Sequence, residues 1–123
     1  MGNKEYFEAL KSKADGFAHK VYRITRKFPK EELYGLTSQL RRASLSVVLN
    51  CIEGYARNNP GKKDKSYGYF LEIAYGSLKE SEYLLEFSLK EGCLSKSDHE
   101  DATKLAGEIG GMIWGAMKSL GYR

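Results

Sequence analysis

The sequence has few of the residues that form cross-links or metal sites: 2 Cys, 2 His and 2 Pro among 123 residues. Cys51 and Cys93 lie far apart, so neither a disulfide framework nor a cysteine metal site is indicated, and both are interpreted as small apolar core residues. No apolar run approaches the ~20 residues of a membrane span. The polar first residues lack the zones of a secretory signal. We therefore expect a cytoplasmic globular protein with one domain over residues 1–123.

Catalytic patterns are also missing. Di-iron bundles need Glu-x-x-His pairs, but Gly16 and Lys96 stand three positions before His19 and His99. Phosphate-binding glycine loops are absent. Asp98 or Asp101 could join His99 and a serine in a triad on paper, but their position at a polar helix start is typical of surface and capping residues. The sequence therefore predicts a non-enzyme without metal or cofactor.

Positive charge is unevenly distributed along the chain. The net charge of +4 permits a polyanionic partner but is too small to identify one. Residues 1–66 hold 14 basic and 7 acidic residues, whereas residues 67–123 hold 6 basic and 9 acidic residues. The first half therefore carries a net charge of +7 and the second half −3, which indicates one basic and one acidic side in a folded chain.

Apolar spacing predicts four helices. Residues 4–28 carry a heptad stripe, and a second helix is expected from Pro29 to about Arg57. A third is expected from Pro60, or just after the following lysines, to a glycine cap at Gly92; the fourth opens at the capping residue Ser95. No segment alternates with period two, and the connections are short. The expected fold class is all-α, an up-down-up-down antiparallel four-helix bundle.

Two polar or small-residue patterns lie inside these helices. Charged and amide groups near the apolar stripe are expected to pair with one another, because an unpaired buried charge costs several kcal/mol. A structural polar network is predicted for Arg42, Asn50, Glu53 and Glu80. In the last helix Gly107, Gly111 and Gly115 share a face, which favours close approach of another helix from the same chain or from another subunit.

Many of these residues also form a recognisable pattern, densest in the run 34–54, YGLTSQLRRASLSVVLNCIEG, and continued by Phe70-Leu71, Gly76-Ser77-Leu78 and Glu80. Over nearly its whole length the chain resembles the four-helix-bundle proteins encoded in 23S rRNA intervening sequences. The resemblance implies a bacterial protein that forms a ring-like homopentamer and binds nucleic acid. It also implies kinship with the accessory proteins of diversity-generating retroelements, which work with a reverse transcriptase.

The basic first half then gives a functional hypothesis: an oligomer that binds RNA or other nucleic acid. Tyr22, Tyr55 and Tyr67 are interleaved with the cations and could stack on bases. Packing at the core edge is the alternative for these tyrosines, and a solvated helix face is the alternative for the cations. A protein scaffold, with a reverse transcriptase as one possible partner, is the alternative function. The candidate binding residues are Lys11, Lys20, Arg23, Lys27, Lys30, Arg41, Arg57, Lys62, Lys63 and Lys65.

Overall fold

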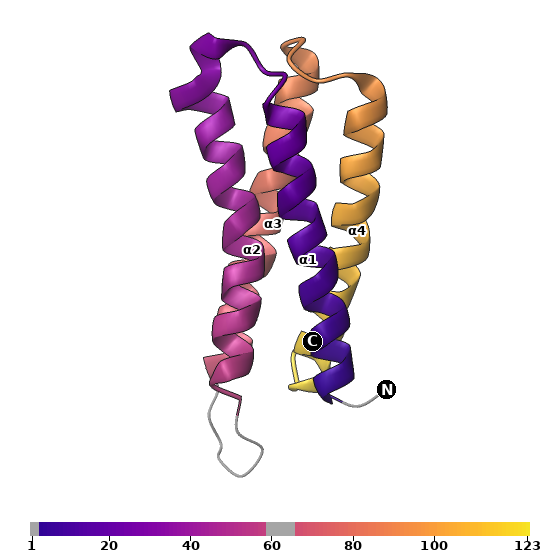
Figure 1. Cartoon of the computed structure of the whole chain (residues 1–123). Helices are drawn as coiled ribbons and strands as arrows, with labels where there is room; N and C mark the ends of the chain where they lie inside the picture. The colour runs from indigo at the N-terminus through magenta and orange to yellow at the C-terminus, as the bar shows by residue number, and fades with distance from the viewer. Residues whose placement is uncertain (1–2, 59–65) are drawn as a thin grey trace.

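The computed structural model describes residues 3–58 and 66–123, and every element within them is helical. The long helices are α1 (Asn3–Thr25), α2 (Ser38–Ala56), α3 (Ser66–Lys90) and α4 (Lys96–Ser119), which run alternately up and down (Figure 1). α1 and α3 each pack against both α2 and α4, which closes the bundle. The predicted antiparallel four-helix bundle is confirmed.

The turn from α3 to α4 forms as its sequence predicts. Gly92 adopts a φ of +79°, the left-handed conformation that favours glycine. The Cys93 amide donates to the Ser88 carbonyl at 2.9 Å and the Gly92 amide donates to Leu89 at 3.1 Å, which is the Schellman arrangement. The Ser95 hydroxyl then accepts from the Asp98 amide at 3.1 Å and caps α4.

The start of the second helix was predicted wrongly. Pro29 precedes a 3₁₀ turn, η1 (Lys30–Glu32), and a π-type turn, η2 (Leu33–Thr37), so that α2 begins nine residues later, at Ser38. Gly35 has φ −115° and ψ −108°, which breaks the helical path. The Glu32 carboxylate accepts from the Leu36 amide at 3.3 Å and closes this turn. The predicted opening of the third helix at Pro60 lies outside the described residues.

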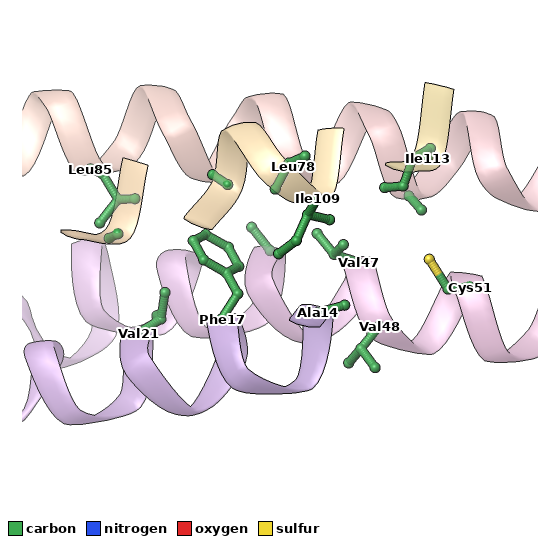
Figure 2. Packing of buried hydrophobic residues seen from close by; sticks show 14 of the residues in the cluster. Ala14, Phe17, Val21, Val47, Val48, Cys51, Leu78, Leu85, Ile109 and Ile113 are labelled. Carbon is green, nitrogen blue, oxygen red and sulfur yellow. The ribbon is translucent and has the colours of Figure 1, made fainter. Parts of the chain in front are cut away.

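The core is built from the predicted heptad positions of α1 and their counterparts on the other helices. Figure 2 shows Phe17 of α1 pointing toward Ile109 of α4, with Val47 of α2 and Leu78 of α3 close by, while Val21 lies nearer to Leu85 of α3. These side chains are almost completely buried. The sequence also predicts α2 to be the most buried helix, because Leu45, Val48 and Ile52 widen its stripe. Val48 is buried, but Leu45 and Ile52 are exposed.

The glycine face of α4 divides into two parts. A Cβ at Gly115 would lie 2.7 Å from Tyr6 Oη, and one at Gly110 would lie 3.4 Å from Leu78. These two positions allow close packing within the chain. Gly107 and Gly111 have no atom within 4 Å of the Cβ position, so their side of α4 faces open space.

Three chemical features of the described residues bear on function. Cys51 is buried and Cys93 half-buried, and both are free thiols. Across residues 3–58 and 66–123, no group of three or more His, Cys, Asp or Glu side chains is placed to hold a metal ion. None of the helices in this part of the chain combines the length and apolar character needed to cross a membrane.

Candidate nucleic-acid interface

A ladder of ion pairs joins α1 to α4. Lys13, Lys20 and Lys27 follow one another at seven-residue steps on α1, which places them on one side of the helix. Their Nζ atoms lie 2.8, 3.8 and 3.4 Å from carboxylate oxygens of Glu108, Asp101 and Asp98, respectively. Lys20 and Lys27, both predicted to bind phosphate, are therefore already paired with carboxylates of α4.

A second set of exposed cations lies at the C-terminal end of α1 and just beyond it: Arg23 is in the last turn of α1, Arg26 follows the helix, and Lys30 opens η1. Arg23, Arg26 and Lys30 are exposed and follow each other at steps of three and four residues. None of the three has an ion-pair partner among the residues that the structure describes. We call them the α1 basic face. Arg23 and Lys30 were predicted, whereas Arg26 was missed, although its spacing from Arg23 gives the signal.

Arg41 connects this region to α2. Its Nε donates to Thr25 Oγ1 at 2.8 Å and its Nη2 donates to the Tyr22 carbonyl at 3.4 Å. The guanidinium carbon lies 4.5 Å from the centroid of the Tyr22 ring. The Thr25 hydroxyl in turn donates to the Val21 carbonyl at 2.8 Å. Arg41 is therefore held in one orientation and Tyr22 is covered on one side.

Beside Arg41 lies a groove of about 450 Å³. Its walls include Tyr22 and Arg41 on one side, Tyr34 of the π-type turn, and Arg42 and Leu45 of α2. We call this the arginine-tyrosine groove. Tyr34 is 92% exposed, so its ring is available to a ligand on the surface. Aromatic rings next to arginines are typical of single-strand nucleic-acid sites, where bases stack and phosphates meet cations. Tyr34 was missed as a stacking candidate by the sequence reasoning.

Arg57 lies at the other end of α2. Sixteen residues of helix separate it from Arg41, which corresponds to about 24 Å. Arg57 Nη2 lies 2.9 Å from Glu53 Oε1, and its guanidinium carbon lies 5.2 Å from the Phe70 centroid. Lys62, Lys63 and Lys65 lie outside the described residues. The predicted binding residues therefore do not form one continuous surface across the described part of a single chain.

Three more of the residues predicted to contact nucleic acid, Lys11, Tyr55 and Tyr67, instead contact side chains of the bundle itself. Lys11 Nζ lies 3.4 Å from Glu8 and 5.7 Å from the Phe7 centroid. The Tyr55 ring stacks on Phe7 at 3.9 Å and 6°, and Tyr67 meets Tyr55 edge-on at 5.9 Å. Tyr55 and Tyr67 therefore pack at the edge of the core, as the alternative for these tyrosines describes.

The polar residues of α2 form a smaller network than the sequence predicts. Asn50 Nδ2 donates to the Ser46 carbonyl at 2.8 Å and to its hydroxyl at 3.0 Å, and the Ser46 and Ser77 hydroxyls are 2.7 Å apart. Glu53 pairs with Arg57 instead of joining this network. Arg42 and Glu80 are exposed, and neither has an ion-pair partner within residues 3–58 and 66–123. The structure thus brings Asn50 together with two serines and leaves Arg42 and Glu80 facing outward.

The histidines occupy ordinary surface positions. His19 Nε2 lies 3.4 Å from Asp15 on the exposed side of α1. His99 is half-buried in the first turn of α4, where its amide donates to the Ser95 carbonyl at 2.9 Å.

Comparisons with known proteins place this arrangement in a family. Residues 9–115 match the family described as 23S rRNA-intervening sequence protein. A similar solved structure is that of a protein of unknown function from the S23 ribosomal protein family of Bacteroides thetaiotaomicron VPI-5482, with a TM-score of 0.80. It is 19% identical, and the match covers 92% of this chain and 98% of that one, which shows a shared fold. No curated protein matches the sequence. Because the family match spans most of its length, this chain belongs to the 23S rRNA-intervening sequence protein family.

Proposed function

We propose that this protein binds single-stranded RNA, or another single-stranded nucleic acid, without catalysing a reaction, and does so in the bacterial cytoplasm. The observation that carries the proposal is the α1 basic face: three exposed cations that have no carboxylate partner among the described residues, at the same end of the bundle as the arginine-tyrosine groove. Phosphates would meet Arg23, Arg26 and Lys30, while a base stacks on Tyr34. The family and its solved relative are named for 23S rRNA and the S23 ribosomal protein family, which favours RNA.

A Tyr34→Ala substitution tests the stacking part of this proposal. Loss of one base stack is worth about 1–3 kcal/mol, so the dissociation constant for a short single-stranded RNA should rise about tenfold. Tyr34→Phe keeps the ring and should bind like the wild type. Equal affinity for all three proteins, measured by fluorescence anisotropy at fixed salt, would contradict a role for Tyr34.

We also propose that the protein acts as a homo-oligomer, with five copies in a ring. The support is an outward apolar stripe on each of two helices: Leu45, Leu49 and Ile52 on α2, and Tyr69, Tyr83 and Phe87 on α3. Leu49 is 58% exposed and Tyr83 is 63% exposed. Arg42 on α2 and Glu80 on α3 are exposed opposite charges, and neither forms an ion pair within the part of the chain that the structure describes. A ring joins two different surfaces, so α2 of one copy would meet α3 of the next, with Arg42 next to Glu80.

A charge swap tests this contact. Light scattering should give five times the 13.9 kDa of one chain for the wild type. Arg42→Glu should dissociate the ring, and adding Glu80→Arg should restore it, whereas Ser12→Glu on the exposed side of α1 should leave it intact. A monomer at every concentration would contradict the proposal and would favour a different protein, such as a reverse transcriptase, on the α2 and α3 stripes.

A further inference from the structure

A pocket of about 450 Å³ opens at one end of the bundle. α1 begins and α4 ends at this end, where Figure 1 marks the two termini. Three tyrosines from three helices line it: Tyr6 of α1, Tyr55 of α2 and Tyr67 of α3. Asn3 and Asn58 add two carboxamides. The volume lies within the range of small-molecule sites, about 300–1,000 Å³.

The aromatic walls of this pocket are fixed before any ligand arrives. Tyr6 Oη donates to the Met112 carbonyl at 2.6 Å, and the bare Cα of Gly115 gives the Tyr6 hydroxyl the room it needs. Tyr55 is stacked on Phe7, and Tyr67 is only 8% exposed. A ligand would therefore not have to order these rings, which lowers the entropic cost of binding.

Among the residues that the structure describes, the lining carries hydrogen-bonding groups but no charged side chain. These described lining residues are Asn3, Tyr6, Tyr55, Asn58, Tyr67, Gly115, Ala116, Ser119 and Leu120. Burial raises the pKa of Tyr67 to about 12, so its phenol keeps its proton at neutral pH. A phosphate or carboxylate would find no cation among the described lining residues, whereas a neutral planar ring would find aromatic walls and amide groups at its edge.

We infer that this pocket binds a single unstacked nucleobase through its aromatic walls and the Asn3 and Asn58 carboxamides. The inference rests on the proposed function in one respect, since a nucleic-acid ligand is what would supply the base. The chemistry agrees with how proteins read exposed bases: rings pack against aromatic side chains, and asparagine hydrogen-bonds the base edge. The pocket and the α1 basic face lie at opposite ends of the bundle, so each can be tested without the other.

Free nucleosides test the pocket alone, because they carry no phosphate. Adenosine, guanosine, cytidine and uridine would each be titrated into the full chain while ¹H–¹⁵N spectra are recorded. The salt concentration would be about 300 mM, which largely screens exposed charges. At least one nucleoside should shift the Asn58 side-chain amide and the Gly115 and Ser119 backbone amides saturably. Asn58→Leu and Tyr67→Phe should each weaken binding about tenfold, the effect of one lost hydrogen bond.

Matched controls separate this result from general loss of structure. Tyr69→Phe removes a hydroxyl two positions from Tyr67, on the exposed side of α3, and should bind nucleosides like the wild type. Absence of shifts with all four nucleosides, or equal shifts with glucose, would overturn the inference. If the wild-type protein binds a nucleoside but no RNA, the proposed function alone is refuted. If it binds RNA but no nucleoside, the pocket alone is refuted.

Discussion

Arg41 lies over the ring of Tyr22, with its guanidinium carbon 4.5 Å from the centroid, while its Nε donates to Thr25 Oγ1 at 2.8 Å. One side chain of α2 thus donates a hydrogen bond to a hydroxyl of α1 and covers an aromatic ring of the same helix. The contact fixes the wall of the arginine-tyrosine groove and ties together the two helices that the π-type turn connects.

Arg41→Lys keeps the charge but removes the planar fork that makes these contacts together. We expect a loss of about 1–2 kcal/mol in the free energy of unfolding, measured by urea denaturation. Arg23→Lys changes an exposed arginine of α1 and should stay within about 0.5 kcal/mol of the wild type. Equal effects at the two positions would show that the Arg41 contacts add no stability.

The Lys13–Glu108 pair predicts a pH effect. The hydrogen bond from Lys13, followed by its charge, lowers the pKa of Glu108 below its ordinary value. The pair therefore stabilises the fold fully above the ordinary glutamate pKa, and this contribution disappears as pH falls through the lowered pKa. Lys13→Ala should raise the Glu108 pKa in a carbon-detected NMR titration. An unchanged Glu108 pKa in Lys13→Ala would contradict the pairing. Lys11→Ala removes another lysine of α1 as a control and should leave the Glu108 pKa as in the wild type.

Alanine substitution at two glycines of α4 should change the stability of the protein in opposite directions. Gly111 has open space at its Cβ position, so Gly111→Ala should stabilise the protein by about 1 kcal/mol through helix propensity. A Cβ at Gly115 would lie 2.7 Å from Tyr6 Oη, so Gly115→Ala must displace the hydroxyl that donates to Met112. We expect a lower urea midpoint for Gly115→Ala than for Gly111→Ala. Identical midpoints would contradict the close approach of Tyr6.

Cys51 should react with thiol reagents only when the protein unfolds. It is buried, and burial raises the pKa of its thiol to about 12, so little reactive thiolate exists at pH 8. Cys93 is half-buried at the turn before α4 and should be labelled first. Mass spectrometry after timed labelling, with and without urea, would follow both sites. Rapid labelling of Cys51 in the native protein would contradict its place in the core.

Helix type and the α1 core could be predicted because periodicity is local information. The heptad residues from Phe7 to Phe28 are all buried, as their spacing requires. The start of α2 was missed because Gly35 and the Glu32 carboxylate form a tight turn inside a stretch whose leucines keep helical spacing.

The candidate site was only partly predictable. Exposure of Arg23 and Lys30 follows from their own helix and turn. Whether Lys20 and Lys27 are paired with carboxylates depends on α4. Their partners Asp101 and Asp98 lie more than 70 positions away, and the sequence does not give the register of two antiparallel helices. The ion pairs that neutralise these two lysines are therefore visible only in the fold.

The salt dependence of RNA binding tests the central claim most directly. Binding of a single-stranded RNA would be measured over a range of salt for the wild type, for Arg23→Ala/Arg26→Ala/Lys30→Ala, and for the equally charged control Lys96→Ala/Lys104→Ala/Lys118→Ala on α4. Loss of three phosphate contacts should make the slope of the log association constant against log salt less steep by about 2 in the first variant. The slope should stay unchanged in the control. Equal slopes for all three proteins would contradict phosphate binding by the α1 basic face.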